Sequence, residues 1–177
     1  MGHDLMIHKA LEENDEVIVC VCGYHDDRGI DFIPFEDRIS LVKDTFENPE
    51  NYTYQEKIKV ISVDDHAIGL SGKFDIPSWE IWSKELFKNA GLDPNDTDIH
   101  FSWYAGEKDY ISKLKQIYPR HYFIQLNRAV HPISGTHIRE NPEKYRNYIY
   151  RTFQRYLIDK KILSLPKNMT AIKITKS

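Results

Sequence analysis

The order of hydrophobic and polar positions along this chain predicts helices and strands in alternation. Apolar residues three or four apart over residues 2–13 indicate a short amphipathic helix. The next run, EVIVCVCG, is continuously apolar up to Gly23, which is typical of a strand buried on both faces. In a helix expected at 78–91, Ser78 is the expected N-cap and Gly91 the expected C-cap. Further helices are expected at 35–46, 107–118 and 141–158, and further strands at 57–65, 98–106 and 121–126.

This order predicts the fold class. Short apolar strands that alternate with helices are typical of an α/β protein with a Rossmann-like, doubly wound and mostly parallel sheet. Ligands bind such a sheet beyond the carboxyl ends of its strands. Candidate chemistry is therefore expected after those strands, at Gly23-Tyr24, at Asp64-Asp65, from Trp103 to Glu107 and in the loop before Ser134.

Length and charge limit the class of protein. The 177 residues suffice for one globular domain, expected at 1–158, followed by a basic tail at 159–177. A formal net charge of −3 excludes a strongly basic nucleic-acid binder, so any anion must be held by a local site. No apolar run reaches the ~18 residues that span a bilayer, and no signal peptide opens the chain, so the expected location is cytoplasmic.

Some residues with reactive side chains have simple interpretations. Cys20 and Cys22 lie two apart on a strand, where they share a face. They are poorly spaced for a disulfide and lack a partner pair for zinc, so we expect two small buried apolar side chains. The acidic pairs Asp26-Asp27 and Asp64-Asp65 could face a metal or a ribose, but ordinary exposed loop acids are the favoured interpretation.

The segment ISGTHIR, residues 133–139, has the composition of a phosphate site. Backbone N–H groups at a helix N-terminus bind phosphate, and Gly135 would let an anion come close. Ser134 and Thr136 add hydroxyl donors, and Arg139 lies about one turn beyond Thr136, where its guanidinium can reach the same anion. The alternative is a plain capped helix with an exposed arginine.

A second candidate phosphate group lies at the start of the chain, where Gly2-His3 precedes the first helix. A histidine there can donate to a phosphoryl oxygen without acting as a base, because phosphoryl and nucleotidyl transfer depend mainly on positioning and charge stabilisation. A histidine near a chain end is more often simply solvated, and that alternative stays open.

Together these segments resemble a known family. GHDLMIHKA resembles the helix that follows the (H/T)-x-G-H signature of the nucleotidyltransferase superfamily, and ISGTHIR resembles its second signature, I-S-x-T-x-x-R. Within the superfamily, VCGYHDDRG, PFEDRISLVKDTF, PSWEIWSKEL and ISGTHIRENPEKYRNYI resemble the adenylyltransferase domain of bacterial NadR-type proteins, from Gly2 to about Phe153. The resemblance implies a HIGH-type nucleotidyltransferase fold and an enzyme that transfers AMP from ATP to nicotinamide mononucleotide (NMN), giving NAD and pyrophosphate.

The resemblance also assigns site residues. It implies that His3 and Arg139 are catalytic, stabilising charge as pyrophosphate leaves. It implies ATP contacts for Gly2, His3, Gly106, Glu107, Ser134, Gly135, Thr136 and Arg139. It implies NMN contacts for Gly23, Asp27, Arg28, Trp79 and Trp82. One of the two tryptophans would stack on the nicotinamide ring, although a W-x-x-W pair on a helix is also typical of a core stripe.

The implied cofactor is Mg²⁺, which would enter with ATP without dedicated protein ligands. The implied partners are the small molecules ATP, NMN and NAD, with neither nucleic acid nor membrane, and a homo-oligomer is left open. One alternative is a catalytically impaired nucleotide-binding or regulatory module of the same fold. Another is a different adenylyltransferase, although the PSWEIW tryptophans and the DDRG loop argue against it.

Two parts of the family pattern are absent from the sequence. The strand that carries the first half of the signature would precede Gly2, and no G-x-x-x-x-G-K-[ST] of a kinase domain follows residue 150. We therefore expect an N-terminally truncated version of the fold. Three explanations stay open: the coding sequence starts upstream of Met1, the sheet closes up without that strand, or the alternating segment TAIKITK near the C-terminus takes its place.

Overall fold

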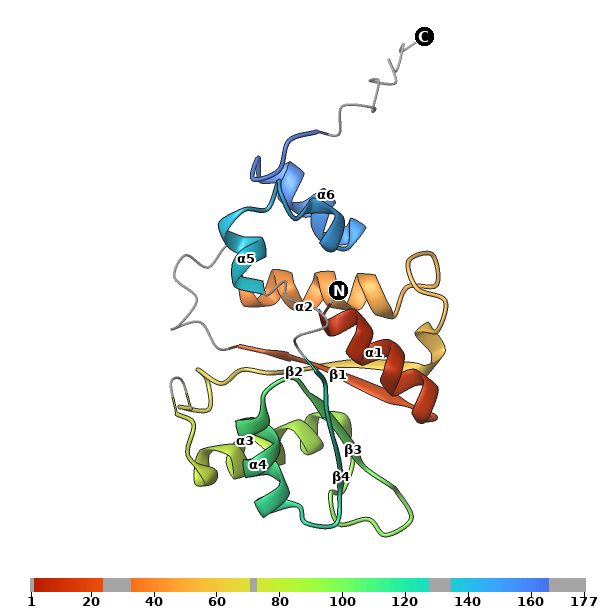
Figure 1. The fold of residues 1–177 in the computed structure, drawn as a ribbon, viewed down its shortest axis with the longest axis vertical. Coiled ribbons are helices and arrows are strands. Elements are labelled where there is room, and N and C mark those ends of the chain that lie inside the picture. The colour runs from red at the N-terminus through yellow and green to blue at the C-terminus, as the bar shows by residue number, and fades with distance from the viewer. Residues whose placement is uncertain (1, 24–32, 71–72, 128–134, 166–177) are drawn as a thin grey trace. The chain divides into compact units, whose positions relative to one another are not determined.

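The computed structural model describes residues 2–23, 33–70, 73–127 and 135–165, and for residues 2 and 3 it describes the backbone alone. The chain forms two compact units, Met1–Ser134 and Gly135–Ser177. The elements of the first unit are α1 (Gly2–Glu13), β1 (Val17–Cys22), α2 (Phe35–Phe46), η1 (Gln55–Lys57), β2 (Ile58–Val63), α3 (Ile76–Ala90), β3 (Ser102–Ala105), α4 (Lys108–Ile117) and β4 (Tyr122–Gln125) (Figure 1). Those of the second unit are α5 (Gly135–Glu140), η3 (Arg146–Tyr148) and α6 (Arg151–Asp159). The predicted boundary at residue 158 stays a prediction.

All described strand pairs are parallel. β1 pairs with β2 from Val17 opposite Ile58 to Cys22 opposite Val63, and β3 pairs with β4. Helices cover both sides of the first pair, with α2 on one side and α3 on the other (Figure 1). The predicted α/β class with parallel strands and helices on both faces is confirmed.

The predicted single sheet is divided into two among the described strands, β1-β2 and β3-β4. Helix α1 packs against both β1 and β3. The hydroxyl of Tyr104 in β3 donates to Glu13 Oε2 at 2.7 Å and accepts from Asn14 Nδ2 at 2.8 Å, so the end of α1 ties the two sheets together. The segment TAIKITK, residues 170–176, lies outside the described residues.

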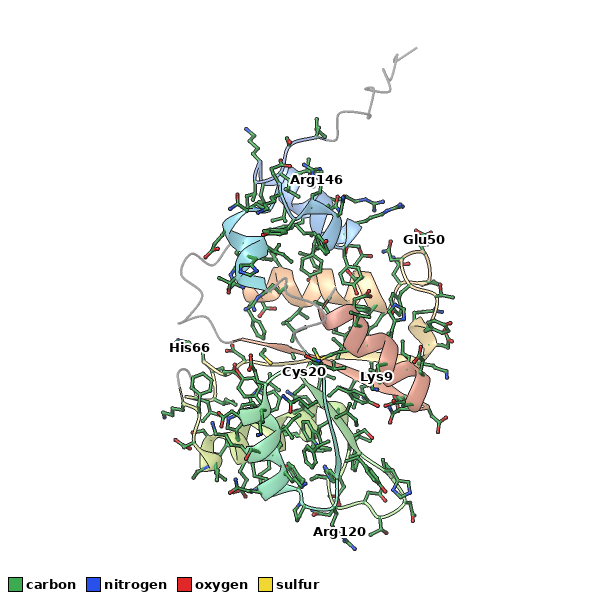
Figure 2. The ribbon with its side chains drawn as sticks, viewed as in Figure 1. Lys9, Cys20, Glu50, His66, Arg120 and Arg146 are labelled. Carbon is green, nitrogen blue, oxygen red and sulfur yellow. The ribbon has the colours of Figure 1, made fainter. Side chains whose placement is uncertain are left out.

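Strand β1 is less buried than its sequence predicts. Val17 and Val21 are buried, but the side chains between them are only partly covered, and Cys20 lies midway along the strand (Figure 2). The physical reason is that β1 pairs with β2 alone among the described strands, so it lacks the neighbour that would cover it in a continuous sheet.

The best-packed part of the first unit lies between β2, α3 and α4. Val63 is fully buried there, and Phe87 makes edge contacts with Trp103 and Tyr118 at ring-centroid distances of 5.7 and 5.5 Å. His121 is part of the same aromatic group. Its Nδ1 accepts from Trp103 Nε1 at 2.9 Å, so its Nε2 carries the proton and donates to the Pro94 carbonyl at 2.9 Å. This histidine is therefore a structural group of the core.

Helix α3 determines where the two predicted tryptophans lie. The expected N-cap Ser78 is wrong: the N-cap is Asp75, whose carboxylate accepts from the Ser78 backbone N–H at 2.8 Å. Pro77 is tolerated in the first turn because the N–H groups there have no helical partner. The predicted C-cap is confirmed, since Gly91 has a left-handed φ of 72° and its N–H bonds to Lys88.

The second unit is held together by a polar cluster. Arg146, labelled in Figure 2, is its centre. Arg146 donates to both oxygens of Glu143 and to the Ser164 carbonyl, and the Ser164 hydroxyl donates to Glu143 at 2.6 Å. These bonds, those from Ser164 first, lower the pKa of Glu143 to about 2. Leu157 in α6 and Leu163, next to Ser164, are buried, and the Leu163 N–H donates to the Leu157 carbonyl at 3.1 Å. In the described part of the chain, no helix is long and apolar enough to cross a membrane.

Candidate functional site

A cavity of about 160 Å³ opens where β1 and β2 end and α3 begins. It is lined by Cys22, Asp65, Leu70, Lys73, Phe74, Ser78, Trp79, Trp82 and Tyr110. It lies at the carboxyl ends of two parallel strands, the place where α/β sheets bind ligands. Because cavities for whole drug-sized ligands usually hold about 300–1,000 Å³, this one suits a single ring of a larger molecule.

A second cavity, of about 280 Å³, lies where the chain enters β3 and β4. Its lining comes from residues 94–101 and 117–122. It contains none of the predicted site residues, and it lies at the amino ends of β3 and β4. The smaller cavity is therefore the candidate site, despite its size.

The two predicted NMN-binding tryptophans both line the smaller cavity. They lie three apart on α3, on adjacent turns of one face, and their rings meet edge to face at 5.3 Å. Trp79 also contacts the ring of Tyr110 from α4 at 4.8 Å. Both tryptophans pack on the core as well, so the alternative interpretation, a core stripe, is also correct for the part of each side chain that faces inward.

Trp79 has an unusual polar atom. Its Nε1 is buried and has no acceptor among the described residues. Buried donors are nearly always paired in folded proteins, so this atom calls for an explanation. An acceptor on a bound ligand would provide one.

The acidic pair after β2 separates into two roles. Asp64 Oδ1 accepts from the backbone N–H groups of His66 at 3.0 Å and Ala67 at 3.1 Å, so it stabilises the turn. Asp65 is only 8% exposed and lines the cavity. The interpretation as ordinary exposed loop acids is wrong for Asp65.

Gly23 directly follows Cys22, the last residue of β1. Its N–H donates to the Val63 carbonyl at 2.9 Å, which extends the β1-β2 pairing by one bond. A Cβ at this position would lie 2.9 Å from the Cα of Asp64, closer than side chains approach backbone. Gly23 therefore lets the turn after β2 come close to β1. The other two residues predicted for NMN on this loop, Asp27 and Arg28, lie outside the described residues.

The cysteines differ in environment. Both are half-buried, not fully buried as expected: Cys22 lines the cavity, and Cys20 lies farther back on the same strand. A hydrogen bond between the two thiols, together with burial, raises the pKa of Cys20. No three His, Cys, Asp or Glu side chains within the described ranges gather in a way that would hold a metal ion.

The predicted phosphate motif is compact within the second unit. Arg139 Nη2 donates to Thr136 Oγ1 at 3.0 Å, and a Cβ on Gly135 would lie 3.3 Å from Arg139 Nη1. The guanidinium thus lies over the first turn of α5, as the spacing of the motif predicts. Ser134 lies outside the described residues. His137 stacks on Tyr145 at 6.2 Å and takes no part in this arrangement.

The remaining predicted ATP residues occupy the ends of elements. Gly106 and Glu107 follow β3 and are half-buried, and Glu107 is the N-cap residue of α4. Gly2 and His3 form the first turn of α1, of which the structure describes the backbone. Their predicted contacts with ATP stay predictions.

Comparison with known proteins supports the motif resemblance. The chain is 28% identical over 159 residues to the trifunctional NAD biosynthesis/regulator protein NadR of Salmonella typhimurium and 27% identical over 157 residues to that of Escherichia coli. Each alignment covers 84% of this chain and 35% of the relative, so the chain spans about a third of the length of these relatives. No family model matches the chain.

Two solved structures have the same fold over most of the chain. The crystal structure of NadR in complex with NR matches with a TM-score of 0.70 and 29% identity, covering 89% of this chain and 42% of that one. The structure of NadR with NAD and AMP-PNP matches with a TM-score of 0.66 and 28% identity, covering 88% and 42%. The predicted resemblance to NadR-type proteins and the predicted Rossmann-like fold class are confirmed.

Proposed function

We propose, from the premise that this chain is a homologue of NadR, that it is an adenylyltransferase that joins NMN to the AMP part of ATP. The products would be NAD and pyrophosphate. The observation that carries the proposal is the cavity at the ends of β1 and β2, in which Trp79 and Trp82, the residues predicted for the nicotinamide, form part of one wall. The solved relatives hold NR, NAD and AMP-PNP, which are ligands of the class proposed here.

The chemistry of the cavity suits a nicotinamide ring. A pyridinium is a flat cation, and it is attracted to the electron-rich face of an indole. The buried side chain of Asp65 lines the same cavity. Flat, apolar surroundings with two indole rings favour an aromatic cation over an aliphatic group.

The proposed phosphate group is the first turn of α5. Arg139 Nη2 lies 3.0 Å from Thr136 Oγ1, so the two donors are close enough together to contact one phosphate. Backbone N–H groups of a helix start add to their attraction for an anion. We assign the β- and γ-phosphates of ATP to these groups, together with Ser134 and Gly135.

The proposed reaction needs no covalent intermediate. The NMN phosphate would attack the α-phosphorus of ATP in line, and the protein's task is to hold two anions close together while charge grows on the leaving pyrophosphate. His3 and Arg139 would donate to that charge. Mg²⁺ would enter with ATP, held by the triphosphate and its own waters, and would neutralise phosphate charge there.

A coupled assay for NAD formed from ATP and NMN tests this function directly. We expect NAD to form, and we expect Trp82→Ala to raise the KM for NMN about tenfold or more while leaving the KM for ATP within about twofold, since stacking on an aromatic ring contributes ~1–3 kcal/mol. Binding of ATP and NMN without formation of NAD would instead favour the regulatory module.

Cys22 provides a second, independent test of the same site. In a Cys20→Ser variant, Cys22 is the remaining cysteine of the chain and lines the cavity. We expect NMN to slow its alkylation by iodoacetamide in a saturable manner, and ATP alone to slow it much less. Alkylation at the same rate with and without NMN would place the nicotinamide elsewhere.

A further inference from the structure

Strand β1 carries two thiols that meet on one face of the sheet. Cys20 and Cys22 lie two apart in β1, so their side chains leave the strand on the same side, and a hydrogen bond joins them. They are the two cysteines of the chain, and both are free and half-buried. The proposed adenylyl transfer uses neither thiol, so their contact calls for a role of its own.

The spacing of the two cysteines does not suit a disulfide. Residues two apart on a strand are separated by about 6.6 Å, and their Cβ atoms are about as far apart because both point the same way. A disulfide needs Cβ atoms about 3.5–4.5 Å apart. The hydrogen bond from Cys22, together with burial, also raises the pKa of Cys20, and oxidants attack the thiolate rather than the thiol. A reversible disulfide between them is therefore disfavoured.

The same spacing suits an ion held between two sulfurs. A metal–sulfur bond is about 2.3 Å long, so a linear arrangement separates the sulfurs by about 4.6 Å, which is within reach of Cβ atoms about 6.6 Å apart. In the described ranges, no three His, Cys, Asp or Glu side chains gather as metal ligands. Zn²⁺ takes four ligands and Mg²⁺ six, mostly oxygens, so neither matches a pair of thiols.

The surroundings of the pair suit a soft cation. Cys20 and Ile18, on the same face of β1, pack against the apolar cluster formed by β2, α3 and α4. Cys22 lines the smaller cavity. One sulfur thus lies in apolar surroundings that keep water away, and the other lies where an ion can enter.

We propose that Cys20 and Cys22 bind one soft monovalent cation, Cu(I), in a linear site with two sulfur ligands. Thiolates select this ion over the harder divalent metals. Each thiol gives its proton to water as its sulfur binds, and the oxidation state of the ion does not change. Since Cys22 lines the cavity, the bound ion lies at the ends of β1 and β2. The site is distinct from the residues assigned to phosphates, and it does not depend on the proposed transfer reaction.

Anaerobic competition for Cu(I) with the coloured chelator bathocuproine disulfonate tests the site in the full chain. We expect the protein to withdraw one Cu(I) per chain, and X-ray absorption spectra of the product to show two sulfur neighbours. Cys20→Ser and Cys22→Ser are each expected to raise the Kd for Cu(I) about 100-fold or more, because the second sulfur of a pair binds intramolecularly. Serine is close to cysteine in size, and circular dichroism checks that both variants fold.

A matched control keeps two thiols on the same face but separates them. Cys20→Ser combined with Ile18→Cys places the thiols four residues apart, about 13 Å, which one ion does not span. We expect this variant to bind Cu(I) as weakly as Cys20→Ser alone. His66→Gln removes an exposed imidazole in the turn after β2 and should leave the Kd within about twofold.

Three results would each overturn the inference. The first is unchanged affinity for Cu(I) in either serine variant. The second is full affinity in the variant with separated thiols, since any two cysteines would then suffice. The third is a single sulfur neighbour in the spectra of the unchanged protein. These readouts do not involve NAD formation, so their failure leaves the proposed function intact.

Discussion

At the scale of single residues, Arg139 shows how a short motif places a charged group. Its guanidinium lies over the first turn of its own helix because residues three apart share a helix face, and Thr136 holds it there. Arg139→Lys removes the planar fork that contacts two phosphate oxygens at once. We expect the Kd for ATP to rise about 10–100-fold, measured by calorimetry.

The control for this change is Arg120→Lys, because Arg120 is an exposed arginine in the lining of the larger cavity. It should leave the Kd for ATP within about twofold. An Arg139→Lys protein that binds ATP as tightly as the unchanged chain would contradict the phosphate assignment.

Gly23 is required for a steric reason. A methyl group at this position meets the backbone of Asp64 at 2.9 Å, and backbone cannot rotate away as a side chain can. We expect Gly23→Ala to lower the free energy of unfolding by about 1–3 kcal/mol in urea titrations. Gly69→Ala is the comparison: a Cβ there meets nothing within 4 Å, so its cost is limited to the left-handed backbone, about 1 kcal/mol. Equal losses for the two variants would rule out the close approach as the cause.

Individual site residues were predictable where a motif or a strand end marked them. Trp79 and Trp82 line the cavity, and Thr136 with Arg139 forms the expected pair. Asp65 was not distinguishable from Asp64 in the sequence, because the full burial of one acid and the partial burial of its neighbour depend on how the turn after β2 packs. Tyr110 was missed for a similar reason, since its place in the cavity depends on the packing of α4 against α3.

At the scale of elements, the start of α3 depends on one cap. Asp75 accepts from the Ser78 N–H, and this bond lowers the pKa of Asp75. We expect Asp75→Ala to lower the thermal unfolding midpoint by several degrees and Asp75→Asn to cost less than half as much, because asparagine caps nearly as well. Circular dichroism at 222 nm follows both. Equal shifts for the two variants would show that the carboxylate acts through charge rather than through the cap.

Most helix and strand positions were predictable because their hydrophobic periods are regular. The helical segment expected at 141–158 is an exception: within it the structure forms only η3 and, from Arg151 on, α6. The helix expected at 35–46 is Phe35–Phe46, and the strand expected within EVIVCVCG is Val17–Cys22. The N-cap of α3 was predicted three residues late because two acceptable caps, Asp75 and Ser78, lie three apart, and Pro77 between them fits either start. The division into two sheets could not be read from local pattern, because pairing joins residues far apart in the chain.

At the scale of the whole molecule, the cluster around Glu143 makes part of the stability depend on pH. The folded pKa of Glu143 is about 2, below its usual 4.5, so the stabilisation is fully present above about pH 4.5 and is lost as pH falls towards 2. We expect the amide resonance of Ser164 to titrate with a midpoint near 2 in NMR spectra, and the thermal midpoint to fall across the same window.

Glu143→Gln removes the titrating group and should abolish the transition of the Ser164 amide. It should also flatten the fall in the thermal midpoint between pH 4.5 and 2. A Ser164 amide that titrates near 4.5 in the unchanged chain would mean that the carboxylate is not bound to Arg146 and Ser164 in solution.

The division between β1-β2 and β3-β4 has a consequence for solvent exchange. In a parallel pair, the N–H groups of a strand point alternately to its two sides, so every second amide of β1 is bound to β2. The amides of β1 should therefore alternate in their rate of hydrogen–deuterium exchange. Exchange should be slow at the amides directed to β2 and faster at those between them. Slow exchange at every amide of β1 would show that another extended segment pairs along its second edge.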